Sequence, residues 1–506
     1  MRASFEELQK RLPGIWQALS DDPSLPRTVV AIPSLSIDIA GMGLPEGMIY
    51  YEERIFYLFN LLRSPNSHLV LVTSHLVPEY LISYYLHLLP SVPFSHARSR
   101  LHLFAASDMT ARPLSDKLLE RPALVERIRR RIRHPENSYI SAYTISRRER
   151  ELAVQLQIPI LGANPEHREL CTKSNSRKLF RRIGVDLPEG MEDLRDESDI
   201  CEAILELHRQ DPALNRVVIK QNETISGMGN AIFPLDALQA AESEGELSRQ
   251  EALALIRDGL PHLARLGTRE LKWDDFMARF QRRGGVVEGF IEGSPCSVQL
   301  RIDPLGGVAL VSTHDELMGG FDNQTYIGCR FPARQEYRQG LHRCGRAIGE
   351  ELARAGVLGR IDADFVAILG EGGWKLEAID INLRKGNTTH PIRTLQFLTG
   401  GQYDPDTGVF ETQSGERRYY VSSDKLASES FRGLLPEDLI DIATYTGIHY
   451  TTSNHTGTVF HMLGGLSELG RLGVTCIEQS YDEAERLYER TREVISQEVN
   501  THDWMI

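Results

Sequence analysis

A chain of 506 residues is too long for one ordinary domain, so two or three domains are expected. With 41% hydrophobic and 25% charged residues, the composition is that of a globular protein, which excludes a disordered chain. The 57 Lys and Arg against 70 Asp and Glu give a formal net charge of −13, which argues against a nucleic-acid or membrane-surface binder because such proteins carry a basic footprint.

Cysteine usage and the apolar runs indicate the cellular compartment. The six cysteines are scattered without metal-ligand spacing, which fits a reducing cytosol. The first residues carry acids where a secretory signal would carry an apolar core, and the apolar runs are too short and too polar to span a bilayer. We therefore expect a soluble cytoplasmic protein. Nothing in the sequence indicates an oligomeric state, and a homodimer is the default because it is the commonest oligomer.

Residues 1–160 alternate strand-like and helix-like segments, which predicts an open α/β sheet. Helical spacing is found in residues 51–59 and in the arginine-rich run 127–133, whose charges we interpret as a solvated helix face. The segment 41–46 ends in Glu where GxGxxG needs its last Gly, so a dinucleotide fold is not favoured. Strands are predicted at 28–32, 69–73, 101–105 and 139–142.

A second region follows a short apolar strand predicted at 158–163. A helix is predicted from Lys173 to Gly184, and a lysine in a first helical turn can help hold an anion near the positive end of the dipole. As a lone feature, such a lysine is more often a solvated surface residue. The charged segment 240–259 is expected to be a helical surface excursion.

Two strands are predicted around a glycine-bearing loop, at 216–220, which ends in Lys220, and at 231–233. Ser226, Gly227 and Gly229 lie in the loop, whose backbone N–H groups can approach phosphates because glycine bends freely. Without context, an ordinary hairpin turn is the better interpretation of this loop.

A further strand is predicted at 285–293, and it contains Glu288, Ile291 and Glu292. Its backbone can pair with a purine edge, and Glu288 can accept a hydrogen bond from the exocyclic amine. The alternative is a plain edge strand with exposed acids.

The most informative segments are 359–365 and 376–384, which both have strand composition. Because side chains alternate along a strand, Asp380 and Asn382 emerge on one face, with Arg384 beside them if the strand continues. A hairpin turn around 369–373 brings Asp364 alongside Asp380. Carboxylate and amide oxygens suit Mg²⁺ and its bound phosphates. The two segments therefore predict a nucleotide-triphosphate enzyme.

The C-terminal part, after a turn-rich segment near residue 400, is expected to be a small α+β region. A helix is predicted at 436–445, strands at 457–463 and 473–478, and a last helix around 484–495. The chain contains no GxxxxGK[ST], HExxH, GxSxG or kinase motif, so the phosphate site is not a P-loop.

The order and the types of the candidate residues from Lys173 to Arg384 resemble those of the ATP-grasp carboxylate–amine ligases. More narrowly, the chain resembles the pheganomycin-type peptide ligases. The resemblance covers nearly the whole chain and implies a pre-ATP-grasp domain at 1–160, a two-lobed ATP-grasp domain at 161–400 with a lid at about 187–282, and a C-terminal domain at 401–506. The segments that carry it are YEER at 51–54, TKSNSR at 172–177, SGMGN at 226–230, STHD at 312–315, GCRFP at 328–332, NLRKG at 382–386 and TLQFLTGG at 394–401.

The resemblance also implies residue roles, with ATP and Mg²⁺ as cofactors. Asp380 stands where ATP-grasp enzymes usually carry Glu, and the acid that usually contacts ribose falls near Ser294 and Pro295, with Glu292 as the nearest substitute. The implied roles are phosphate contact for Lys173 and Lys220, the phosphate-covering loop for Ser226, Gly227 and Gly229, adenine recognition for Glu288 and Ile291, Mg²⁺ ligation for Asp364, Asp380 and Asn382, and stabilisation of the transferred phosphoryl for Arg384.

The expected reaction joins a small-molecule carboxylate to the amine of an amino acid or peptide through an acylphosphate, releasing ADP and phosphate, as in secondary metabolite biosynthesis. The alternatives are a regulatory or scaffold protein that binds ATP with reduced catalysis, and a nicotinamide-dependent oxidoreductase that lacks its glycine fingerprint. Five residues are candidates for the acceptor pocket, although each can equally be a satisfied structural residue: His314, Asp315, Arg330, His390 and Arg393.

Overall fold

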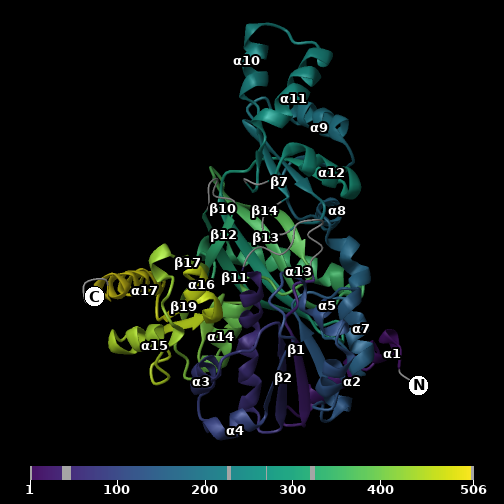
Figure 1. The fold of residues 1–506 in the computed structure, drawn as a ribbon. Coiled ribbons are helices and arrows are strands. Elements are labelled where there is room, and N and C mark those ends of the chain that lie inside the picture. The colour runs from purple at the N-terminus through teal and green to yellow at the C-terminus, as the bar shows by residue number, and fades with distance from the viewer. Residues whose placement is uncertain (1–2, 37–46, 225–228, 269–270, 320–324, 503–506) are drawn as a thin grey trace.

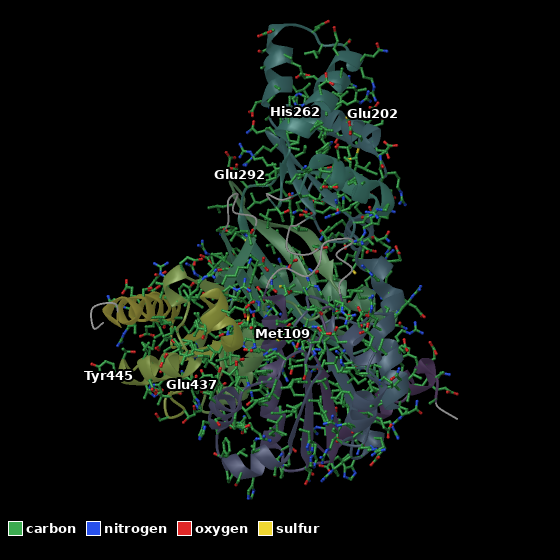
Figure 2. The ribbon with its side chains drawn as sticks, in the orientation of Figure 1. Met109, Glu202, His262, Glu292, Glu437 and Tyr445 are labelled. Carbon is green, nitrogen blue, oxygen red and sulfur yellow. The ribbon has the colours of Figure 1, made fainter. Side chains whose placement is uncertain are left out.

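The computed structural model describes residues 3–36, 47–224, 229–268, 271–319 and 325–502. The segment 41–46 and two predicted loop residues, Ser226 and Gly227, lie outside the described residues. Figure 1 shows a parallel sheet at the bottom, a central sheet above it in green, and a helix-rich lobe at the top in teal, with the C-terminal residues in yellow to the left. In Figure 2, Glu202 and His262 mark the top lobe, and Glu437 and Tyr445 mark the C-terminal part.

The first sheet has the strand order β3-β2-β1-β4, and every pairing in it is parallel. Alternate residues of β1 and β2 belong to two separate apolar cores, one on each face, because helices cover both sides of a parallel sheet. The four predicted strands are confirmed as β1 (Arg27–Ile32), β2 (Ser67–Thr73), β3 (Leu101–Ala105) and β4 (Tyr139–Ala142).

The helices around this sheet agree with the expected alternation, with three differences. The helix predicted in the arginine-rich run 127–133 ends at Arg129, so the last four residues of the run lie outside it. The segment predicted to be helical at 51–59 is part of η1 (Met48–Arg63), a 3₁₀ helix. The predicted strand at 158–163 is wrong: only an isolated bridge joins Ile160 to Ile140, since Pro159 has no N–H to extend a ladder. The other helices are α1 (Phe5–Gln9), α2 (Leu12–Asp21), α3 (Glu79–His87), α4 (Phe94–Ser99), α5 (Leu114–Leu119), α6 (Pro122–Arg129), η2 (Pro135–Asn137), α7 (Arg147–Leu156) and η3 (Pro165–Cys171).

The top lobe is built on a sheet of order β5-β9-β6-β7-β8, whose apolar face packs against helices in a core of its own. The predicted charged excursion is a pair of helices, α10 and α11, at the tip of this lobe (Figure 1). The edge-strand alternative for β9 is wrong, because β9 lies between β5 and β6. The elements are β5 (Gly190–Leu194), α9 (Glu197–Gln210), β6 (Arg216–Gln221), β7 (Asn230–Pro234), α10 (Asp236–Glu244), α11 (Arg249–Leu263), β8 (Arg265–Leu266), α12 (Trp273–Arg283) and β9 (Gly285–Gly289).

The central sheet has the order β14-β13-β10-β11-β12-β17-β19-β18. Its first strands pack with α8 and α13 around one apolar core. The sequence analysis predicted no strand for β10, β11 or β12 and no helix for α13. The elements are α8 (Lys173–Ile183), β10 (Ser294–Ile302), β11 (Val308–Gly319), β12 (Thr325–Phe331), α13 (Gln335–Arg354), β13 (Gly359–Gly370), β14 (Gly373–Asn382) and α14 (Thr389–Thr399).

Residues after 400 extend the central sheet with β17, β18 and β19, so no break in the sheet occurs at the domain limit predicted there, and the three domain limits stay predictions. The predicted last helix and the helix at 436–445 are confirmed. Among the described residues, no helix is long and apolar enough to cross a membrane. The elements are β15 (Gln402–Asp404), β16 (Val409–Glu411), β17 (Tyr419–Ala427), η4 (Glu429–Phe431), α15 (Pro436–Tyr445), β18 (Gly457–His461), η5 (Leu463–Gly465), α16 (Leu466–Leu469), β19 (Arg471–Glu478) and α17 (Tyr481–His502).

A buried polar network joins the C-terminal strands to the N-terminal part, beside the apolar core that the two share. Arg54 of η1 forms an ion pair with Asp424 of β17 at 3.3 Å, and Nε2 of His461 lies 2.8 Å from the same carboxylate. Burial raises the pKa of Asp424, but Arg54 and the hydrogen bond with His461 outweigh burial and hold that pKa well below its usual range. The carboxylate is therefore ionised and fixes the two regions to each other.

Candidate active site

The predicted acidic hairpin is formed by β13 and β14, which pair with Asp364 opposite Asp380 and Asp362 opposite Asn382. Arg384 lies two residues beyond the end of β14, and its Nη2 donates to Oδ1 of Asn382 at 3.0 Å. Nδ2 of Asn382 in turn donates to Oδ2 of Asp364 at 3.0 Å. The structure therefore joins Arg384, Asn382 and Asp364 in one hydrogen-bonded chain, and the strand register places Asp380 opposite Asp364.

This group concentrates negative charge in a buried position. Burial and the neighbouring Asp380 raise the pKa of Asp364 to about 7, although Lys173 and Arg384 act in the opposite direction. Burial and Asp364 raise the pKa of Asp362 well above its ordinary value, and Oδ1 of Asp362 has no hydrogen-bond partner among the described residues. A buried carboxylate oxygen without a donor is costly, so the site favours a bound cation.

The sequence analysis did not identify two acids that lie close to this group, Asp362 and Glu316. Asp362 had a signal, because its spacing of two from Asp364 places both on one face of β13. Glu316 had none, since it comes from β11, which reaches β13 only through β10. Burial and Asp364 raise the pKa of Glu316 to about 8.

The donor set suits Mg²⁺ that is shared with a nucleotide. Two carboxylates and an amide oxygen are hard oxygen ligands, and Mg²⁺ is usually held by one or two carboxylates together with substrate phosphates. In the part of the chain that the structure describes, no three His, Cys, Asp or Glu side chains converge as a complete metal site. The hairpin therefore fits a cation whose remaining ligands come from phosphate oxygens and water.

Lys173 is the first residue of α8, as predicted, and its ammonium forms an ion pair with Asp380. Thr172 caps the helix by accepting from the backbone N–H of Asn175, and the backbone N–H of Lys173 donates to the carbonyl of Asn222 at 3.2 Å. The helix start is therefore fixed between the hairpin and the strand that leads into the glycine-bearing loop.

Lys220 and Glu288 share one face of the top sheet and form a buried ion pair. Nη1 of Arg177, from α8, donates to the other oxygen of Glu288 at 2.6 Å, a contact that the sequence did not reveal. Burial raises the pKa of Glu288, but Lys220 and Arg177 together outweigh it and lower that pKa. The Glu288 side chain is thus already engaged, and pairing with adenine stays a prediction.

The chain leaves β9 after Gly289 and crosses to the central sheet through residues 290–293. Ile291 is half-buried and Glu292 is exposed (Figure 2), where it pairs with Arg216. Arg216 also lies over the ring of Phe290, with 4.1 Å between its Cζ and the ring centroid. Ile291 and Glu292, which are predicted to contact the nucleotide, therefore lie in the connection between the two sheets rather than in a strand.

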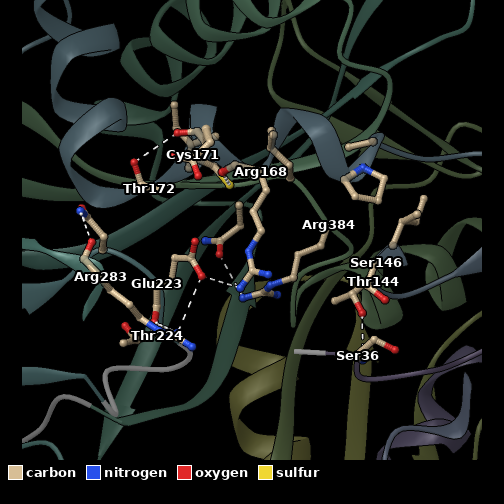
Figure 3. A pocket seen from close by; sticks show the side chains of 18 of the residues that line it. Ser36, Thr144, Ser146, Arg168, Cys171, Thr172, Glu223, Thr224, Arg283 and Arg384 are labelled. Atoms are coloured by element: carbon tan, nitrogen blue, oxygen red, sulfur yellow. Dashed lines mark hydrogen bonds and ion pairs between the residues drawn. The ribbon is translucent and has the colours of Figure 1, made fainter. Parts of the chain in front are cut away.

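A cavity of about 730 Å³ opens where the N-terminal part, α8 and the hairpin meet. Figure 3 shows Arg384 in it, facing Arg168 and Glu223, with Ser36, Thr144 and Ser146 of the N-terminal part along another wall. Its volume lies in the ordinary range for ligand sites, roughly 300–1,000 Å³. Five predicted residues line it, namely Lys173, Gly229, Asp380, Asn382 and Arg384, whereas Lys220, Glu288, Ile291, Glu292 and Asp364 do not.

Gly229 is required by a close approach in the loop that borders this cavity. A Cβ at this position would lie 1.9 Å from Cγ2 of Thr224, which real contacts never show. Packing against Thr224 therefore explains glycine at position 229, and its approach to a ligand stays a prediction.

Four of the five candidates for the acceptor pocket line none of the cavities described here. His314 contacts the hydroxyl of Tyr420, Asp315 accepts from Tyr337, Arg330 pairs with Glu485, and Nδ1 of His390 lies 2.9 Å from the carbonyl of Arg54. Each of these four residues has a partner within the protein, as expected for the alternative that they are satisfied structural residues. Arg393 lines a smaller cavity next to the first.

Comparison with known proteins identifies the family. Residues 165–406 match the family described as IQCH-like, ATP-grasp, and residues 438–491 match the PGM1 C-terminal domain. The L-propargylglycine–L-glutamate ligase of Streptantibioticus cattleyicolor is 30% identical over 453 residues, which are 86% of this chain and 87% of that protein. The IQ motif-containing protein H of Danio rerio is 24% identical over 541 residues, 98% of this chain and 50% of that protein.

Two solved structures show the same fold at low sequence identity. The biotin carboxylase of Campylobacter jejuni aligns with a TM-score of 0.54 and 13% identity over 95% of this chain and 96% of that one. N5-carboxyaminoimidazole ribonucleotide synthetase in complex with ADP aligns with a TM-score of 0.50 and 11% identity over 94% of this chain and 98% of that one. The chain therefore belongs to the ATP-grasp family and is a homologue of an amino acid ligase.

Proposed function

We propose that this chain is an ATP- and Mg²⁺-dependent carboxylate–amine ligase that forms a peptide or amide bond through an acylphosphate. The observation that carries the proposal is the chain of contacts from Arg384 through Asn382 to Asp364, with Asp380 and Lys173 beside it, at the wall of the large cavity. The ligase from Streptantibioticus cattleyicolor, which by its name joins two amino acids, supports the reaction type.

The chemistry proceeds in two displacements. A carboxylate oxygen attacks the γ-phosphorus of ATP, the bond to the β–γ bridging oxygen breaks, and ADP leaves. The amine nitrogen then attacks the carbonyl carbon of the acylphosphate, the carbon–oxygen bond to phosphate breaks, and the amine loses a proton. Because charge develops on the transferred phosphoryl, the protein contributes mainly positioning and charge neutralisation.

In this proposal, each charged residue of the hairpin has a distinct role. Asp364, Asp380 and Asn382 would hold Mg²⁺, which would neutralise phosphate charge when bound. Arg384 faces the transferred phosphoryl and stabilises its charge. The ammonium of Lys173 forms an ion pair with Asp380, and in this proposal it would bind a phosphate oxygen when the nucleotide is present.

The remaining nucleotide contacts come from the top lobe. Lys220 binds phosphate, Gly227 and Gly229 lie in the loop that covers the phosphates, and Glu288, Ile291 and Glu292 contact adenine and ribose. We propose that the lobe at about 187–282 closes over the site and keeps water from the acylphosphate, which would otherwise hydrolyse.

Trapping the intermediate tests this function. The protein is incubated with MgATP, hydroxylamine and a panel of amino acids and dicarboxylic acids, with L-glutamate as the first probe, and ADP, AMP and hydroxamate are quantified. We expect ADP and a hydroxamate, because hydroxylamine competes with the amine for the acylphosphate. ATP binding without ADP release from any acid would favour the regulatory or scaffold alternative, and release of AMP would indicate adenylation.

A further inference from the structure

A second cavity, of about 170 Å³, lies between the first sheet and the central sheet, and its wall is strongly cationic. Asp303 is the only acid among its described lining residues, and its Oδ1 already accepts from the backbone N–H groups of Leu305 and Gly307. Five cationic side chains line the cavity, namely Arg301, Arg360, Arg384, Lys385 and Arg393. A small cavity with this charge balance is suited to an anion.

The strand register places two of these cations in direct opposition. Arg301 of β10 pairs with Arg360 of β13, and like charges opposite each other on neighbouring strands are destabilising. Nη1 of Arg360 and Nε of Arg301 are buried without a hydrogen-bond partner among the described residues. Burial, Arg393 and Arg301 lower the pKa of Arg360 to about 9. The charge of Arg360 is therefore not compensated by the described part of the chain.

Among the described residues, the hydrogen bonds and ring contacts of Arg301, Arg393 and Lys385 are with neutral groups. Arg301 lies over the ring of Trp16, 4.9 Å from its centroid. Arg393 lies over the ring of Phe397 and donates to the amide oxygen of Gln396 at 2.9 Å. Lys385 donates to the backbone carbonyl of Ala142. Such contacts hold the side chains in place without neutralising them, which leaves the cavity prepared for a negatively charged group.

The two cavities adjoin each other. Ile145, Ala163, Leu383 and Arg384 line both, so an anion in the small cavity lies next to the position where Arg384 faces the large one. The small cavity is below the ordinary size of a ligand site, roughly 300–1,000 Å³, and so suits one end of a small molecule rather than a nucleotide.

We infer that the small cavity binds the second carboxylate of a dicarboxylic acid substrate, whose first carboxylate reacts beside Arg384. This inference rests on the proposed ligase function and names its acid class. The bound carboxylate supplies the counter-ion that Arg360 lacks among the described residues, and it also fixes the orientation of the reacting end.

Kinetics with paired substrates provide the first test. ADP release is measured with L-glutamate and with L-glutamine, which lacks one carboxylate, for the full chain, for Arg360→Gln and for the control Arg354→Gln, an exposed arginine paired with Glu351. We expect Arg360→Gln to raise the KM for L-glutamate at least tenfold without changing the KM for ATP, and Arg354→Gln to change neither. Equal turnover of glutamine and glutamate together with an unchanged KM in Arg360→Gln would overturn the inference and leave the ligase function intact.

Binding without ATP gives a second test that does not need turnover. Calorimetric titration with glutarate, butyrate and inorganic phosphate is compared for the parent and Arg360→Gln. We expect glutarate to bind the parent at least tenfold more tightly than butyrate and to lose that advantage in the variant. If inorganic phosphate binds tightly and glutarate does not, the cavity takes a free phosphate and the inference is wrong. Absence of ADP release with retained glutarate binding would instead contradict the proposed function alone.

The melting temperature separates a binding role from a structural one. Because Arg360 carries a buried charge without an ion-pair partner among the described residues, Arg360→Gln without ligand should melt at a temperature equal to or above that of the parent, while glutarate should stabilise the parent more than the variant. A variant that melts lower and responds to glutarate as the parent does would show that Arg360 serves the fold only.

Discussion

Glu288→Gln and Lys220→Met should destabilise the top lobe to different extents, although the two residues form one ion pair. Glu288 is 2% exposed and neutralises both Lys220 and Arg177. Its removal leaves the buried ammonium of Lys220 without an anion and Arg177 with Glu192 alone, 3.2 Å away, and breaking a buried pair in this way costs about 3–5 kcal/mol. Removing Lys220 leaves Glu288 paired with Arg177, so we expect the smaller cost of a lost hydrogen bond, about 1–3 kcal/mol.

Hydrogen exchange measured by mass spectrometry resolves the two effects, because it reports local opening free energies. Peptides covering β6 and β9 should lose more protection in Glu288→Gln than in Lys220→Met. Peptides covering β1 serve as the internal control, since β1 lies in another sheet and should not change. Equal losses in the two variants, or unchanged protection in Glu288→Gln, would refute the view that Glu288 balances two cations.

Three other substitutions test the site and the domain junction. Asp380→Asn should abolish ADP release at an unchanged circular dichroism spectrum, because a Mg²⁺ ligand is lost. Arg384→Ala should lower kcat by about 10²-fold or more while the Kd for ATP changes little, as expected for a group that acts on the transition state. Asp424→Asn should reduce the free energy of unfolding at pH 7 by about 3–5 kcal/mol, since Arg54 loses its buried partner. Because the folded pKa of Asp424 is lowered, this contribution is present above about pH 3.9 and is lost as the pH falls through the folded pKa, so thermal unfolding of parent and variant should converge in acid.

The acidic hairpin could be predicted from the sequence because its information is local. Alternation along β14 places Asp380 and Asn382 on one face, and the turn between β13 and β14 brings Asp364 into register. The same reasoning applied to Asp362 would have extended the site. The four parallel strands of the first sheet were equally predictable, since each is a short apolar run bounded by turns.

The contacts that the sequence did not reveal are non-local. The meeting of Lys220 with Glu288 depends on the register of β6 against β9, which no spacing within either strand specifies. The third partner, Arg177, comes from a helix that precedes both. The cationic cavity was missed for the same reason: Arg301 and Arg360 become neighbours only through the pairing of β10 with β13.

The fate of the carboxylate oxygen tests the central claim most directly. The acid that supports ADP release, with L-glutamate as the first probe, is labelled with ¹⁸O in both carboxylates and incubated with MgATP and the amine acceptor. Attack of a carboxylate oxygen on the γ-phosphorus followed by displacement by the amine predicts inorganic phosphate that carries one ¹⁸O atom, visible as a shifted line in the ³¹P NMR spectrum. Unlabelled phosphate, or ¹⁸O found in AMP, would contradict the acylphosphate mechanism.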